Sequence, residues 1–95
     1  MKKISIIIPA YNEQDSLPFL FERLNNLTNQ LQDYEFEILF VNDGSKDKTL
    51  ELIKEQRKID NKISYVSFSR NFGKEIAMMA GLDYASMNII ASPVA

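Results

Sequence analysis

Three short segments of the sequence carry the side chains that could bind a ligand. Each segment follows an apolar run typical of a strand in a parallel sheet, and open α/β sheets bind ligands at the carboxyl ends of such strands. A tyrosine ring can stack on a base, carboxylates accept hydrogen bonds from sugar hydroxyl or base N–H groups, and cations can face a diphosphate. Converging loops would therefore form a polar pocket with a stacking surface. The side chains are those of Tyr11, Glu13, Asp43, Arg70 and Lys74.

The overall composition restricts the chemistry that the chain could perform. It has 95 residues, 45% of them hydrophobic and 25% charged, which is typical of one ordinary globular domain. Cysteine and histidine are absent, so the sequence lacks a thiolate nucleophile, an imidazole base and the usual zinc ligands. Its 11 basic and 13 acidic residues give a net charge of −2, which does not favour nucleic acid as a partner.

The segment Asn42-Asp43-Gly44 could form either of two structures. It contains the dipeptides that favour a two-residue hairpin turn, which would make Asp43 a turn residue. A hairpin needs a second strand, whereas the following residues Thr49–Lys58 have a helical pattern. We therefore favour a strand-to-helix loop, in which Asp43 accepts hydrogen bonds from a ligand and Gly44 allows close backbone approach.

Known phosphate-binding loops are absent from the sequence. It has three glycines, and they match neither the Gly-x-Gly-x-x-Gly pattern nor the P-loop pattern. Arg70 and Lys74 flank Asn71-Phe72-Gly73 after a predicted strand, where they could face a diphosphate or merely solvate a loop. Tyr11 could stack on a base or pack beneath its own loop. Residue type alone leaves these alternatives open.

The hydrophobic pattern predicts the elements that would position these residues. Strands and helices alternate, which predicts an α/β fold with a parallel sheet of three to four strands and helices on both faces. Pro9 is expected to end the first strand, because proline donates no ladder hydrogen bond. The predicted strands are Ile4–Ile8, Glu35–Val41, Ile63–Ser69 and a short one within Asn88–Ala91; the predicted helices begin after a cap at Asp15 or Ser16, run from Thr49 to Lys58, and run from Gly73 to Tyr84.

The helices and the sheet edge carry further signals. Asp47 is expected to cap the second helix, and the alternating run Ile63–Ser69 is expected to be an edge strand. The third helix lacks a clear polar face, so we expect it to be covered on several sides. The first helix is expected to bury one apolar face formed by Leu17, Leu20, Phe21, Leu24, Leu27 and Leu31.

Three ordered motifs resemble the inverting glycosyltransferases of family 2, in particular dolichyl-phosphate mannosyltransferase and the bacterial polyprenyl-phosphate (bactoprenol) glucosyltransferases. The motifs are Ile6–Glu13, Val41–Ser45, and Ser69–Glu75 with Ala80–Ala85. The resemblance implies the N-terminal half of a GT-A, Rossmann-like fold, a UDP- or GDP-sugar as donor and a lipid phosphate as acceptor. It also implies nucleotide-binding roles for Pro9, Tyr11, Glu13, Val41, Asp43, Arg70 and Lys74.

The sequence departs from this family after Ser86. Family members carry an Asp-x-Asp motif that holds Mg²⁺ or Mn²⁺ against the donor diphosphate, whereas no acidic residue follows Asp83 here. The departure implies that residues 1–95 form a single truncated domain with a divergent tail at 87–95, without catalytic or metal-binding residues. Mg²⁺ or Mn²⁺ and membrane contact are expected only of the complete enzyme, at the cytoplasmic face of the membrane. The chain as given has no signal peptide or membrane span, and we expect it to be cytoplasmic.

Two other classes of function fit parts of the pattern. A non-catalytic interaction domain would form homo-oligomers through an unpaired sheet edge or the apolar helix Ile76–Leu82, since exposed surfaces of this kind tend to find partners. A truncated glycosyltransferase domain is expected to self-associate through the same two surfaces, because the missing part of the enzyme would otherwise cover them. A phosphoacceptor signalling domain would use Asp43 and Lys74, but it needs an acidic pair where Pro9–Asn12 stands, so it is disfavoured.

Overall fold

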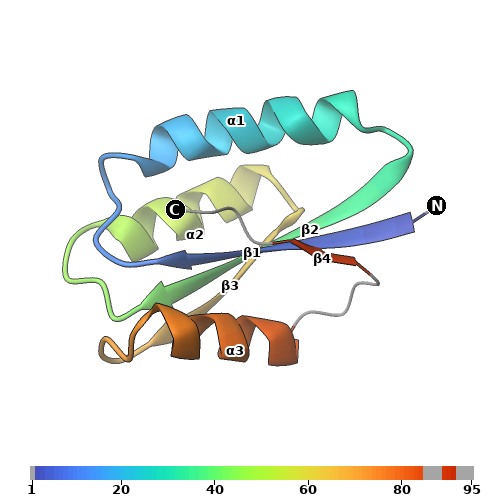
Figure 1. Cartoon of the computed structure of the whole chain (residues 1–95). Helices are drawn as coiled ribbons and strands as arrows, with labels where there is room; N and C mark the ends of the chain where they lie inside the picture. The colour runs from blue at the N-terminus through green and yellow to red at the C-terminus, as the bar shows by residue number, and fades with distance from the viewer. Residues whose placement is uncertain (1, 85–88, 92–95) are drawn as a thin grey trace.

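The computed structural model describes residues 2–84 and 89–91, and strands alternate with helices along the chain (Figure 1). The strands pair in parallel in one four-stranded sheet of order β3-β2-β1-β4, which confirms the predicted fold class. Of the predicted tail, residues 87, 88 and 92–95 lie outside the described part. The elements are β1 (Lys2–Ala10), α1 (Leu17–Gln30), β2 (Tyr34–Asp43), α2 (Thr49–Ile59), β3 (Ile63–Phe68), α3 (Lys74–Tyr84) and β4 (Ile89–Ala91).

The register of the sheet aligns the carboxyl ends of β1, β2 and β3. Ala10 pairs with Asn42, and Asp43 pairs with Phe68, so the three loops that follow these strands leave the same edge. β3 lies at one side of the sheet, as the alternating pattern predicts. This edge therefore gathers the segments that carry the candidate ligand-binding residues.

Helices cover both faces of the sheet: α1 and α2 lie on one face and α3 on the other (Figure 1). Successive side chains of a strand point to opposite faces, so Ile38 and Phe40 join the core under α1 and α2, whereas Leu39 and Val41 join the core under α3. Phe40 is fully buried and meets Phe21 of α1 edge to face, with ring centroids 5.6 Å apart. The sheet therefore has apolar packing on both sides, as its uninterrupted apolar runs predict.

Two strands extend beyond their predicted ends. β2 continues to Asp43, so Asn42 and Asp43 are buried strand residues rather than loop residues. β1 continues through Pro9, and the prediction that Pro9 ends the strand is wrong. In the described residues, β4 pairs with β1 only from Ile4 to Ile6. No described residue of β4 lies opposite Pro9, so the missing N–H of this proline leaves no hydrogen bond to β4 unmade.

The first helix buries fewer apolar side chains than its spacing predicts. Leu17 and Leu24 are buried, but Leu27 is 42% exposed and Leu31 is 39% exposed. α1 ends at Gln30, which leaves Leu31 at its C-cap, and Thr28 takes a buried position in the last turn. The prediction of a continuous leucine face was wrong for its last two members.

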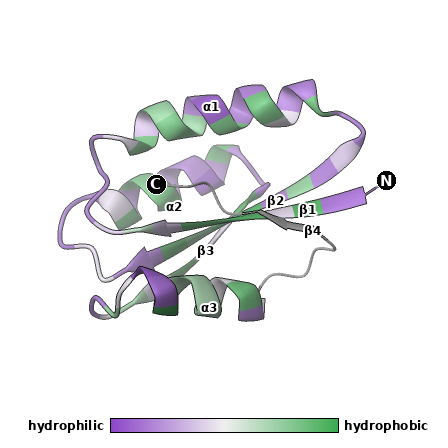
Figure 2. Cartoon of the chain, in the orientation of Figure 1, coloured by the Kyte–Doolittle hydropathy of each residue, from purple (hydrophilic) through white to green (hydrophobic). Residues whose placement is uncertain are grey.

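Figure 2 shows that hydrophobic residues make up the middle of the third helix. Several of their side chains are exposed. Ala77 is fully buried, and a Cβ at Gly81 would overlap Ile7 of β1, so this side of α3 lies directly on the sheet. Ile76, Met79 and Leu82 are exposed, so the described residues do not provide the cover that we expected on several sides. In the described part of the chain, no helix has the length and apolarity needed to cross a membrane.

Candidate functional site

A pocket of about 210 Å³ lies at the carboxyl edge of the sheet, between the loops that follow β1 and β3 and the last residue of β2. Of the seven residues predicted for the site, five line this pocket. Tyr11 is 42% exposed, which leaves its ring accessible rather than buried beneath its loop. The pocket is lined by Pro9, Ala10, Tyr11, Glu13, Asp43, Asn71 and Lys74.

The structure places the other two predicted residues outside the pocket lining. Val41 is fully buried in the core beneath α3, beside Ile7 and Ala77. Arg70 is exposed, and its guanidinium carbon lies 4.7 Å from the centroid of the Phe72 ring. A position over an aromatic face is favourable for a cation.

Asp43 anchors the loop between β3 and α3. Asp43 is only 2% exposed, and both of its carboxylate oxygens accept hydrogen bonds. Oδ1 accepts from the backbone N–H of Phe72 at 2.8 Å, and Oδ2 accepts from that of Gly73 at 2.9 Å and from Nδ2 of Asn71 at 3.2 Å. A carboxylate offers about four acceptor positions, so about one remains for a ligand donor. Sequence reasoning missed Asn71, because its contact with Asp43 joins residues far apart in the chain.

Gly44 lets the β2–α2 loop touch the β3–α3 loop. Its φ of 72° lies in the left-handed region, and a Cβ there would overlap backbone atoms of Arg70 and Asn71. Asp43 and Gly44 therefore hold the same neighbouring loop, one by hydrogen bonds and one by close backbone contact.

The β1–α1 loop is bound to the β2–α2 loop by side-chain hydrogen bonds to backbone N–H groups. The Asp47 carboxylate accepts from the N–H of Thr49, two residues further on, at 2.9 Å and from the N–H of Gln14 at 3.2 Å. Thr49 Oγ1 donates to Asp47 and accepts from the N–H of Glu13 at 2.7 Å. The predicted cap at Asp47 is not confirmed, because Lys48 occupies the N-cap position of α2 and no side-chain cap hydrogen bond forms there.

Asp47 has a lowered pKa. Burial alone would raise the pKa of this carboxyl, but hydrogen bonds from the Thr49 hydroxyl and from the backbone N–H groups of Thr49 and Gln14 outweigh that effect. The folded state therefore stabilises the charged form. This contribution is complete above the ordinary pKa of 3.8 and is lost as the pH falls through the lowered value.

We expect Asp47→Ala to lower the free energy of unfolding at pH 7 by about 1 kcal/mol, because it removes the hydrogen bonds that the carboxylate accepts from Thr49 and Gln14. The difference from the unsubstituted chain should shrink as the pH falls below 3.8, because protonation removes the same interaction. Urea unfolding at a series of pH values measures this. Asp15→Ala, at an exposed carboxylate in the β1–α1 loop, is the control and should be neutral. A pH-independent difference would contradict the assignment.

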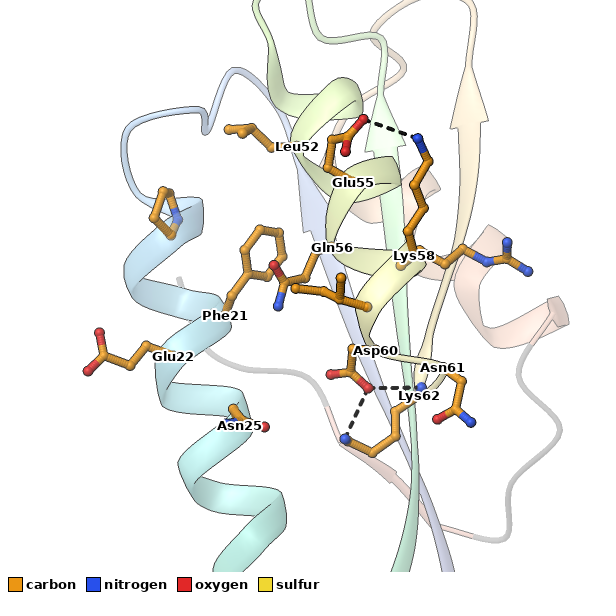
Figure 3. Close-up of a pocket in the computed structure, with 13 residues that line it drawn as sticks. Phe21, Glu22, Asn25, Leu52, Glu55, Gln56, Lys58, Asp60, Asn61 and Lys62 are labelled. Carbon is orange, nitrogen blue, oxygen red and sulfur yellow. Dashed lines mark hydrogen bonds and ion pairs between the residues drawn. The ribbon is translucent and has the colours of Figure 1, made fainter.

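A larger hollow of about 910 Å³ lies between α1 and the C-terminal part of α2 (Figure 3). Phe21 and Leu52 contribute apolar surface, and two ion pairs lie among the charged side chains that line the hollow. Lys58 lies 3.3 Å from Glu55, and Lys62 lies 3.0 Å from Asp60. These residues lie away from the three loops of the carboxyl edge. We therefore place the candidate site at the smaller pocket, where the predicted residues converge.

The chain's potential metal ligands do not converge in the described part. No group of three or more Asp, Glu, His or Cys residues there is arranged to hold a metal ion.

Comparison with known proteins connects this geometry to one family. The profile described as Glycosyl transferase family 2 matches residues 5–92. The bactoprenol glucosyl transferase of Shigella phage SfV is 44% identical over 84 residues, which are 88% of this chain and 27% of the relative. The chain spans about a quarter of the length of the curated relatives that it matches.

Solved structures agree on the fold. S. aureus TarS 1–349 in complex with UDP has a TM-score of 0.73 and 29% identity, over 98% of this chain and 27% of that one. A mannosyltransferase from Pyrobaculum calidifontis in complex with GDP-Man and Mn²⁺ has a TM-score of 0.71 and 24% identity, over 92% of this chain and 25% of that one. The predicted resemblance to the N-terminal part of GT-A transferases is confirmed.

Proposed function

Because the chain belongs to glycosyl transferase family 2, we propose that it is the nucleotide-sugar-binding part of an enzyme that transfers a hexose from a UDP- or GDP-sugar to a polyprenyl phosphate. It is related to bactoprenol glucosyltransferases. The observation that carries the proposal is the convergence of five predicted residues around one pocket. The chain alone should bind the donor without transferring its sugar, and its parent enzyme should act at the cytoplasmic face of the membrane.

Each side chain of the pocket has a proposed role. The exposed ring of Tyr11 stacks on the base, and Pro9 gives the pocket an apolar wall. Glu13 and the remaining acceptor position of Asp43 take hydrogen bonds from the nucleoside. Lys74 begins α3, where a cation and the positive end of the helix favour a diphosphate.

Arg70 and Val41 act from outside the pocket lining in this proposal. Arg70 leaves the Phe72 ring and pairs with the diphosphate from the rim, a move that an exposed side chain can make. Val41 supports the floor from the core beneath α3 and does not touch the nucleotide through its side chain.

Both donor bases remain in the proposal, because TarS was solved with UDP and the mannosyltransferase with GDP-Man and Mn²⁺. Calorimetric titration of the chain with UDP and GDP, with and without Mn²⁺, tests it. We expect saturable binding of one nucleotide and little change on adding Mn²⁺, because the described residues offer no cluster of metal ligands. A folded chain that binds neither nucleotide would contradict the proposal.

Self-association is the second candidate function. Exposed Ile76, Met79 and Leu82 form an apolar strip on α3, and β3 leaves one side of the sheet open within the described residues. We propose that copies of the chain pair through one of these surfaces. Sedimentation at micromolar concentrations should then detect dimers, and a strictly monomeric chain would contradict this second candidate.

A further inference from the structure

We infer that Asn12 is a positioning residue that sets the wall of the pocket carrying Tyr11 and Glu13. Asn12 is the one non-glycine residue with a positive φ, 52°, in the described part of the chain. It stands between the two pocket residues in the β1–α1 loop. The inference rests on the proposed function only in treating this pocket as a nucleotide site.

Asn12 joins two loops by reciprocal hydrogen bonds. Its backbone N–H donates to Ser45 Oγ at 3.0 Å, and its Oδ1 accepts from the backbone N–H of Lys46 at 2.9 Å. Gln14 repeats the pattern, because its Oε1 accepts from the N–H of Lys48 at 3.0 Å. Backbone groups of both loops are thus satisfied by side chains of the other loop, which makes the loops one unit.

The left-handed backbone of Asn12 lies between two pocket residues. Its φ of 52° bends the chain away from the extended path of β1, which ends at Ala10, at the point where the loop meets Ser45 and Lys46. Tyr11 and Glu13 both line the pocket. Glu13 is fixed further, since its N–H donates to Thr49 Oγ1 and its Oε2 accepts from Ser16 Oγ at 2.8 Å.

Position 12 requires a left-handed backbone and a side-chain acceptor for the N–H of Lys46, and asparagine provides both. It tolerates the left-handed region better than most residues with a Cβ, and its amide oxygen reaches a nearby backbone N–H. Glycine would keep the backbone freedom and lose the acceptor, whereas alanine would lose both. Aspartate would keep an acceptor and much of the tolerance, so it is the conservative variant.

Hydrogen exchange of the ligand-free chain tests the inference. We expect Asn12→Ala to accelerate exchange about tenfold at the N–H groups of Lys46, Glu13 and Gln14. Thr49 and Asp47, the acceptors for Glu13 and Gln14, are unchanged in this variant. Asn12→Gly should fall between Asn12→Ala and the unsubstituted chain, and Asn12→Asp should restore protection. If exchange is faster only at the N–H of Lys46, the Asn12 side chain holds that one hydrogen bond and does not position the loop. This result would overturn the inference.

Nucleotide titration of the same variants gives the functional readout. Asn12→Ala should weaken binding of UDP or GDP about tenfold in protein that remains folded at the assay temperature. The control is Asp60→Ala, which removes a similar bond from the N–H of Lys62 at the opposite end of the sheet and should lower stability without changing affinity. Unchanged affinity in Asn12→Ala would overturn the inference. If the unsubstituted chain binds neither nucleotide, the proposed function fails, while the exchange result still decides the role of Asn12.

Discussion

Asp43→Asn is expected to lower the free energy of unfolding by about 2–3 kcal/mol and to abolish measurable nucleotide binding. The carboxylate accepts from three donors, two of which are backbone N–H groups that face different oxygens. An amide replaces one oxygen with a donor, so one N–H group would face another N–H group in a nearly buried site. The β3–α3 loop would then separate from the strand and carry Lys74 away from the pocket.

Urea unfolding measures the stability of this variant, and calorimetry measures its affinity for UDP and GDP. Asn71→Ala is the matched control, because it removes one donor to Asp43 and leaves both backbone donors in place. It should cost about 1 kcal/mol and weaken binding less. If Asp43→Asn keeps the stability and affinity of the unsubstituted chain, the anchoring role of Asp43 is wrong.

Gly44→Ala is expected to destabilise the chain by about 3 kcal/mol, from a strained backbone and an overlap that side chains cannot relieve. The φ of 72° disfavours a residue with a Cβ, and the atoms that this Cβ would meet belong to the backbone of Arg70 and Asn71. Relief requires the two loops to move apart, which would also open the pocket.

Gly73→Ala separates the two causes, because Gly73 has a φ of 100° but open space around the position of a Cβ. It should show the strain alone, so its loss of stability should be clearly smaller than that of Gly44→Ala. Chemical denaturation of both variants under the same conditions makes the comparison. Equal losses would mean that the contact between the loops contributes nothing.

Local pattern was sufficient to predict the sheet and the edge at which the candidate residues gather. The apolar runs in β1 and β2, the alternation in β3 and the helical spacing in α2 are properties of neighbouring residues, and they place Tyr11, Glu13 and Asp43 at one edge. The end of β2 was misplaced because Asn42 and Asp43 are polar, and their burial depends on partners in β3 and the loop after it.

Long-range contacts determine what the pattern could not predict. Val41 points into the core rather than the pocket because α3 covers its face of the sheet, which the sequence of β2 does not specify. Asp43 was expected to be free for a ligand, but its donors lie 28 to 30 residues further along the chain. Asn12 gave no signal beyond its residue type, since both its backbone angle and its partners depend on the neighbouring loop.

Site-resolved titration by NMR tests the central claim that the carboxyl edge of the sheet binds a nucleotide. UDP and GDP would be added in turn to the isotope-labelled chain, and the amide shifts would be followed. We predict saturable shifts at Tyr11, Glu13, Asn71 and Lys74 with one of the nucleotides, and none in the hollow between α1 and α2 (Figure 3). Shifts confined to that hollow, or no shifts at all in the folded chain, would contradict the account.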